Sequence, residues 1–156
     1  MKNLKNIFRK YKNSEVIFAK LLGFGGLIPF IIGLIILNFN INKSQVLEIV
    51  IIYAYTIIAF LGGIYWGVGL NIKVIAKRYF FISTLPTILI FISLLFSLSQ
   101  IFKLIYLIVI LNFFLYLEFY FFKKKLSKWF LDLRIKLNIS LTVLLTLIIL
   151  SMYLSI

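Results

Sequence analysis

The sequence contains no cysteine and no histidine, and it has only four acidic residues. Without these side chains it cannot form disulfides, thiol nucleophiles, the usual zinc sites, histidine-ligated haem or a histidine general base. The four acids are Glu15, Glu48, Glu118 and Asp132, so a membrane protease that uses two aspartates is also excluded. We therefore expect a protein that is not an enzyme, with no catalytic residues, no metal and no cofactor.

Charged residues are scarce, and long apolar runs take their place. The 156 residues are 63% hydrophobic and 13% charged, and their mean hydropathy is +1.13, well above that of soluble domains. A helix needs about 20 apolar residues to cross a bilayer. Five stretches are long enough, at residues 20–38, 46–70, 79–98, 101–122 and 135–156. The sequence predicts an all-α polytopic membrane protein, with one five-helix transmembrane domain over residues 20–156 behind a basic segment, residues 1–19.

The net charge of +13 is unevenly distributed along the chain. All 17 lysines and arginines except Lys43 and Lys103 lie in the N-terminal segment or beside the connections that follow the second and fourth predicted spans. Basic residues collect on the cytoplasmic side of a membrane. We expect a multi-pass protein of the bacterial inner membrane, with its N-terminus cytoplasmic and its C-terminus outside. Anionic lipids of the inner leaflet, and not nucleic acid, are the expected partners of the basic loops.

The basic N-terminal segment has two interpretations. Leu4, Ile7, Phe8 and Tyr11 recur at helical spacing among basic residues, which is typical of an amphipathic helix lying on the inner leaflet. A solvated basic tail that only enforces orientation explains the same residues equally well. In either case Ser14, followed by an acid, is suited to begin the first membrane helix as its capping residue.

Small residues recur every four positions in the first two predicted spans, a pattern that lets helix backbones approach closely. Proline adds an expected kink at Pro29 and, in the third span, at Pro86. We expect the glycines of the second span to contact the first helix near Pro29, although contact with a ligand is an alternative. The predicted packing positions are Gly25, Gly26, Pro29, Gly33, Ala59, Gly62, Gly63, Gly67 and Pro86.

The fourth span carries Glu118, the residue that is most costly to place in a membrane. The next helical turn holds only aromatic residues, so a cation would have to come from another helix. Arg134 is the first candidate and Arg78 the second, while a glutamate that simply reaches headgroups and water remains an alternative. We predict a cytoplasm-facing polar cluster, formed by Glu118, Arg134, Tyr65, Trp66 and Trp129. An alternative for either tryptophan is a simple interfacial anchor.

Four short motifs come in an order and spacing that resemble a known family. They are Gly26-Leu27-Ile28-Pro29-Phe30, Phe60-Leu61-Gly62-Gly63-Ile64-Tyr65-Trp66-Gly67, Ser83-Thr84-Leu85-Pro86 and Trp129-Phe130-Leu131-Asp132-Leu133-Arg134. The chain is similar to the small polytopic membrane proteins grouped as domain of unknown function 3429, which include the mitochondrial transmembrane protein 69. The resemblance covers nearly the whole chain, and it implies a fold but no activity.

The last motif departs from the family pattern. The family tends to show proline and a small residue before the tryptophan and tyrosine after it, whereas this chain has Ser127-Lys128 before Trp129 and Phe130 after it. At the position of Glu118 the family more often has aspartate, so the resemblance implies a carboxylate there.

Three classes of function are compatible with these observations. The first is a non-catalytic packing, assembly or accessory subunit of a membrane complex, because glycine faces are mostly packing faces. The second is a small oligomeric transporter or channel subunit that uses Glu118 as its ionisable site. The third is a lipid-acting membrane enzyme, which the missing histidine and cysteine disfavour. The expected partner is a second copy of the chain or another membrane protein.

Overall fold

The computed structural model describes the backbone of residues 2–39, 42–71, 76–96 and 98–154, and side chains from residue 14 onward within these ranges, except at residues 76 and 154. Helices dominate this part of the chain. Their bounds are α1 Lys2–Gly25, α2 Ile28–Asn38, α3 Lys43–Leu70, α4 Ala76–Leu95, α5 Gln100–Leu117 and α6 Lys128–Leu154. One turn of π-helix, η1 Glu118–Phe122, continues α5.

Within the part of the chain that the structure describes, five helical segments are long and apolar enough to cross a membrane. They are Ser14–Asn38, Lys43–Leu70, Lys77–Leu95, Gln100–Phe122 and Lys128–Tyr153. For the described residues, the all-helical fold and the presence of five helices suited to span a membrane are therefore confirmed, and they suggest a multi-pass membrane protein. The fifth helix begins earlier than the predicted span, because the interfacial residues from Lys128 onward are already helical.

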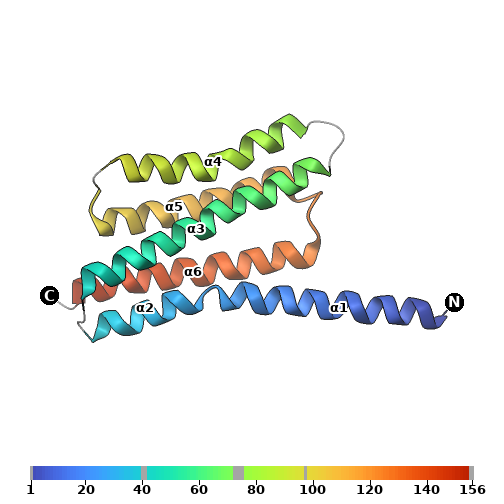
Figure 1. Ribbon diagram of the computed structural model, residues 1–156, viewed down its shortest axis with the longest axis horizontal. Helices are drawn as coiled ribbons and strands as arrows, with labels where there is room; N and C mark the ends of the chain where they lie inside the picture. The colour runs from blue at the N-terminus through green and yellow to red at the C-terminus, as the bar shows by residue number, and fades with distance from the viewer. Residues whose placement is uncertain (1, 40–41, 72–75, 97, 155–156) are drawn as a thin grey trace.

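The predicted helix start at Ser14 is wrong. A single helix, α1, passes through this position, because nothing in the sequence between residues 2 and 25 breaks a helix. The long α1 extends beyond the rest of the bundle toward the N-terminus (Figure 1). The predicted amphipathic pattern from Leu4 to Tyr11 stays a prediction, because the side chains of these residues lie outside the described ones.

The first span is broken, and its break precedes the expected position. The helix is interrupted at Gly26–Leu27, and Pro29 lies in the first turn of α2, where a missing N–H is tolerated. The N–H of Phe30 donates to the Leu27 carbonyl instead of the Gly26 carbonyl. The Gly26 carbonyl accepts a hydrogen bond from the Tyr53 hydroxyl of α3 at 3.2 Å instead. Proline thus reorganises the turn before it, and a side chain from another helix satisfies the freed acceptor.

The helices form a bundle in which α3 packs against α2, α4 and α5, while α6 packs against α1, α2 and α5 (Figure 1). The core lies where α3, α5 and α6 face one another, and its apolar side chains are fully or almost fully buried. It includes Leu47, Ala54, Ile58, Leu104, Leu107, Leu111, Phe114, Leu145 and Ile148. The outward faces carry many exposed large apolar side chains, as expected for surfaces that contact lipid.

Only some of the predicted glycine positions mediate helix packing within the chain. A Cβ atom at Gly33 would lie 2.6 Å from Val50 of α3, and a Cβ at Gly62 would collide with the carbonyl oxygen of Ser83 in α4. Gly69, which we did not predict, also lies close to α4, where a Cβ would be 3.0 Å from the Phe80 ring. These three glycines allow α3 to approach its neighbours.

The small residues that recur every four positions do not form continuous packing surfaces within the chain. A Cβ atom at Gly25, Gly63 or Gly67 would meet nothing within 4 Å among the described residues. The expectation that the glycines of α3 contact the first span near Pro29 is wrong, because Gly62 faces α4 and its Cβ would lie 3.6 Å from Pro86. Helical periodicity identifies a face but does not say which neighbour covers it.

Candidate functional site

A charged pair lies inside the bundle between η1 and α6. The Arg134 Nε atom is 3.0 Å from Glu118 Oε1 and 3.1 Å from Glu118 Oε2. Glu118 is completely buried, and Arg134 is only 7% exposed. Both charges are thus removed from solvent, and each is compensated by the other, which is the condition under which a buried charge is tolerated.

Tyr65 completes the polar centre from a third helix. Its hydroxyl donates to Glu118 Oε1 at 2.8 Å, and the tyrosine is itself fully buried in α3. Glu118, Arg134 and Tyr65, which we call the Glu118 cluster, therefore tie together α3, η1 and α6. Oε1 accepts from two donors, so the carboxylate is fixed in position as well as neutralised.

Aromatic rings separate the Glu118 cluster from its surroundings. The Tyr65 ring stacks on Phe122 with a centroid distance of 4.7 Å and lies 6.1 Å from Phe114. Tyr79 of α4 meets the edge of Phe122 at 4.9 Å and donates a hydrogen bond to the carbonyl of Phe121 at 3.3 Å. Glu118 opens the π-helical turn, a type of local widening that is often found at functional sites.

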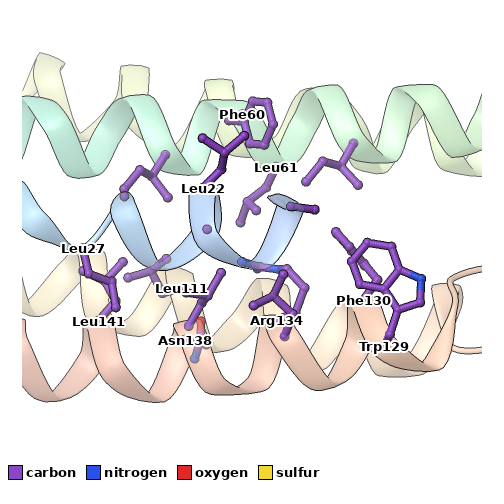
Figure 2. Close-up of a pocket in the computed structure, with 17 residues that line it drawn as sticks. Leu22, Leu27, Phe60, Leu61, Leu111, Trp129, Phe130, Arg134, Asn138 and Leu141 are labelled. Carbon is purple, nitrogen blue, oxygen red and sulfur yellow. The ribbon is translucent and has the colours of Figure 1, made fainter. Parts of the chain in front are cut away.

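A pocket adjoins this cluster on the α6 side. It has a volume of about 450 Å³ and is bounded by α1, the α1–α2 corner, α3, α5 and α6. Figure 2 shows Arg134 and Asn138 on α6, across from Leu22 and Leu61, with Trp129 and Phe130 at one end. Apart from Arg134 and Asn138, the lining side chains are apolar or aromatic, with two glycines among them. Arg134 therefore belongs both to the Glu118 cluster and to the pocket wall.

A chain of amides holds Asn138 in one orientation. The Asn138 side-chain nitrogen donates to Asn112 Oδ1 at 3.0 Å, and the Asn112 nitrogen donates to the Ile108 carbonyl at 2.8 Å and to Thr142 Oγ1 at 3.3 Å. Since Asn112 uses its nitrogen on these acceptors, it must present its oxygen to Asn138. This network joins α5 to α6 one turn from the Glu118 cluster.

The structure brings together only part of the predicted polar cluster. Trp129 lines the pocket next to Arg134 and packs edge-on against Phe130, with ring centroids 5.8 Å apart. Trp66 is 48% exposed and packs on Phe80 of α4, on the opposite side of α3 from the pocket. Arg78, the second candidate partner of Glu118, is exposed.

Sequence reasoning did not identify a largely apolar pocket on the α6 side or the place of Asn138 in its wall. A lone asparagine among apolar residues carries too little signal, because its importance depends on Asn112 in another helix. Among the residues that the structure describes, no group of three or more acidic residues could hold a metal ion.

The arrangement is suited to holding helices together and to receiving an apolar molecule, but it does not present an accessible carboxylate. Both oxygens of Glu118 are already engaged by Arg134, and one of them also by Tyr65. A carboxylate that binds and releases a transported ion must have an oxygen that the ion can reach. The Glu118 cluster lacks that opening among the described residues.

Comparison with known families gives one match. The family described as "Protein of unknown function (DUF3429)" matches residues 16–152, which is nearly the whole chain. No curated protein and no solved structure matches the sequence. The resemblance inferred from the four motifs is therefore confirmed at the level of the family, whereas the likeness to transmembrane protein 69 stays a prediction.

Proposed function

Because the chain belongs to the DUF3429 family of proteins of unknown function, and because its geometry is that of a packing protein, we propose that it is a non-catalytic accessory subunit of a membrane complex. In this proposal it lies in a bacterial inner membrane with the N-terminus in the cytoplasm. Its basic loops then face the anionic inner leaflet, and the distribution of lysine and arginine supports this orientation.

One observation carries this proposal, namely a groove between the outer faces of α3 and α4. It has a volume of about 420 Å³, and small side chains form much of its surface. Its lining residues are Ala59, Gly62, Gly63, Trp66, Ser83, Thr84, Thr87 and Ile88. Gly62 is already used against α4, whereas a Cβ at Gly63 or at Gly67, one turn further on, would meet no described atom. Glycine surface that the chain itself leaves uncovered supports close approach by a further helix.

The occupant that fits this groove is one transmembrane helix of another protein. The hydroxyls of Ser83 and Thr84 bond back to carbonyls of their own helix at 2.6 and 2.8 Å, so the groove does not demand a charged or polar ligand. Association inside a membrane rests on close packing of small residues, because lipid removes the hydrophobic drive between helices.

The transporter alternative receives less support. It needs Glu118 to exchange an ion, yet that carboxylate is completely buried and held by Arg134 and Tyr65. If the protein is an accessory subunit, proton-coupled flux into liposomes that contain it should equal the flux into protein-free liposomes. Flux that is lost in Glu118→Gln but kept when surface lysines are changed would favour the transporter instead.

Site-specific photo-crosslinking in native membranes tests the docking groove. A photoreactive residue at position 63 should give one discrete adduct with a different membrane protein, and Gly67→Leu should abolish it. Position 25 is the matched control, since a Cβ at Gly25 also meets nothing but lies outside this groove. An adduct at twice the mass of the chain would identify a second copy instead of a partner. That result, or equal crosslinking at both positions, would refute the proposal.

A further inference from the structure

Two residues in the wall of the pocket beside α6 each carry a buried polar atom that has no hydrogen-bond partner among the described residues. These atoms are Arg134 Nη2 and Asn138 Oδ1. Both residues line the pocket and are more than nine-tenths buried, at 7% and 2% exposure. A buried polar group without a partner is costly, so a pair of them on one pocket wall points to a missing ligand.

The two atoms have opposite hydrogen-bonding character. Arg134 contacts Glu118 through Nε, which leaves Nη2 as a free donor. Asn138 commits its nitrogen to Asn112, which leaves Oδ1 as a free acceptor. The two residues are four apart on α6, so they project from the same face with a separation of about 6 Å along the helix. A ligand group that complements this wall must both accept and donate.

We propose that this pocket binds a neutral single-chain lipid whose hydroxyl group accepts a hydrogen bond from Arg134 Nη2 and donates one to Asn138 Oδ1. The site is distinct from the α3–α4 groove and does not depend on the accessory function proposed above. It lies on the other side of α3, between that helix, the α1–α2 corner and α6.

Charge balance selects a neutral head group. The Arg134 charge is already compensated by Glu118, so an anionic head would bring an unbalanced charge into a largely apolar pocket. It would also place its oxygens against the Asn138 oxygen, which can only accept. A hydroxyl is the simplest group that satisfies both orphaned atoms, since it carries one donor and two acceptor lone pairs.

The size of the pocket and the depth of its polar residues favour a lipid with a single hydrocarbon chain. The volume of about 450 Å³ lies toward the lower end of the ~300–1,000 Å³ range of small-molecule sites. Along α6 the lining runs from Trp129 to Leu141, which is about 18 Å of helix, and the two polar residues lie in the middle. The head group would therefore sit among apolar side chains, below the level of the interfacial tryptophan, where a hydrated phosphate would lose its water.

Quenching of Trp129 fluorescence by brominated probes tests this inference. The full chain with Trp66→Phe keeps Trp129 as its only tryptophan, and it is reconstituted in phosphatidylcholine nanodiscs. The probes are 11-bromo-1-undecanol, 1-bromoundecane and 11-bromoundecyl phosphate. We expect saturable quenching by the alcohol at a membrane concentration about tenfold lower than for either other probe, because two orphaned groups gain partners.

Two pocket variants locate the binding. Asn138→Leu removes the acceptor and should make the alcohol and the bromoalkane equivalent. Ile57→Phe fills the pocket without touching the polar atoms and should abolish saturable quenching, whereas Ile52→Phe on the lipid-exposed face of α3 should not. If Asn138→Leu fails to fold, the comparison of Ile57→Phe with Ile52→Phe still decides the result.

Three outcomes would overturn the proposal. Equal quenching by the alcohol and the bromoalkane in the Trp66→Phe protein would show that the polar pair is not used. Tighter binding of the phosphate would show that the site is anionic. Unchanged quenching in Ile57→Phe would place the probe outside the pocket.

Discussion

Arg134 contacts both carboxylate oxygens of Glu118 with a single nitrogen, Nε, at 3.0 and 3.1 Å. This geometry differs from the common two-nitrogen fork between arginine and a carboxylate. Nη2 lies on the same edge of the guanidinium as Nε–H, yet it has no partner among the described residues. One side chain therefore serves two features, the ion pair that joins η1 to α6 and the wall of the neighbouring pocket.

Reversing either charge of this pair should be severely destabilising. Glu118→Arg or Arg134→Glu places two like charges in a buried site, and the loss in unfolding free energy should reach at least the ~3–5 kcal/mol seen when one partner of a buried pair is removed. Membrane abundance and thermal unfolding in mild detergent would measure it.

The double swap, Glu118→Arg with Arg134→Glu, should recover part of that loss. Recovery should be incomplete, because the Tyr65 hydroxyl would then face a guanidinium, which cannot accept its hydrogen bond. Single reversals that leave abundance and melting temperature unchanged would contradict the pairing.

Removing the Tyr65 hydroxyl should have a smaller effect than breaking the ion pair. Tyr65→Phe deletes one hydrogen bond to a charged acceptor while keeping the stacked ring, so we expect a loss of about 1.5–3 kcal/mol in unfolding free energy. Tyr153→Phe is the control, because Tyr153 is 59% exposed. Equal melting temperatures for the two variants would argue against a structural role for the Tyr65 hydroxyl.

Neighbouring glycines of α3 should respond in opposite ways to alanine. Gly62→Ala forces a methyl group against the Ser83 carbonyl and should cost about 1–3 kcal/mol by separating α3 from α4. Gly63→Ala adds a methyl where nothing lies within 4 Å, and it should be neutral or stabilise the helix by up to about 1 kcal/mol. Thermal unfolding of the isolated protein compares them directly, and a similar loss in both would contradict the assigned packing.

Orientation in the membrane can be measured without first removing native thiols, because the sequence has no cysteine. Lys124→Cys and Gln45→Cys place exposed thiols at opposite ends of the bundle. By the charge distribution, an impermeant maleimide added to intact cells should label Gln45→Cys, while Lys124→Cys should react only after the membrane is opened. The reverse labelling pattern would show that the N-terminus is outside.

Much of this fold follows from the sequence because lipid restricts the choice of structure. A run of apolar residues that must satisfy every backbone group internally forms a helix, so five long runs predict five spans. From the sequence, Arg134 is also the first candidate partner of Glu118, since the next turn of its own helix provides no cation, although Arg78 and a glutamate that reaches headgroups are alternatives at that level.

Other features depend on rotations of helices about their axes, which no periodicity specifies. Gly62 and Gly63 are adjacent, yet one faces Ser83 and the other faces open space. The π-helical turn at Glu118 and the free oxygen of Asn138 arise from contacts between helices that are distant in sequence. A pocket formed by residues from α1, α3, α5 and α6 leaves no local pattern that sequence reasoning could detect.

The corner between α1 and α2 has a consequence for how the protein is assembled. Its freed Gly26 carbonyl is satisfied by Tyr53, which lies 27 residues later in the chain. Because α1 and α2 precede α3 in the chain, the Gly26 carbonyl lacks this donor until α3 packs beside it. The break in the first span is therefore completed only by a later helix, so the first span does not reach its final conformation by itself.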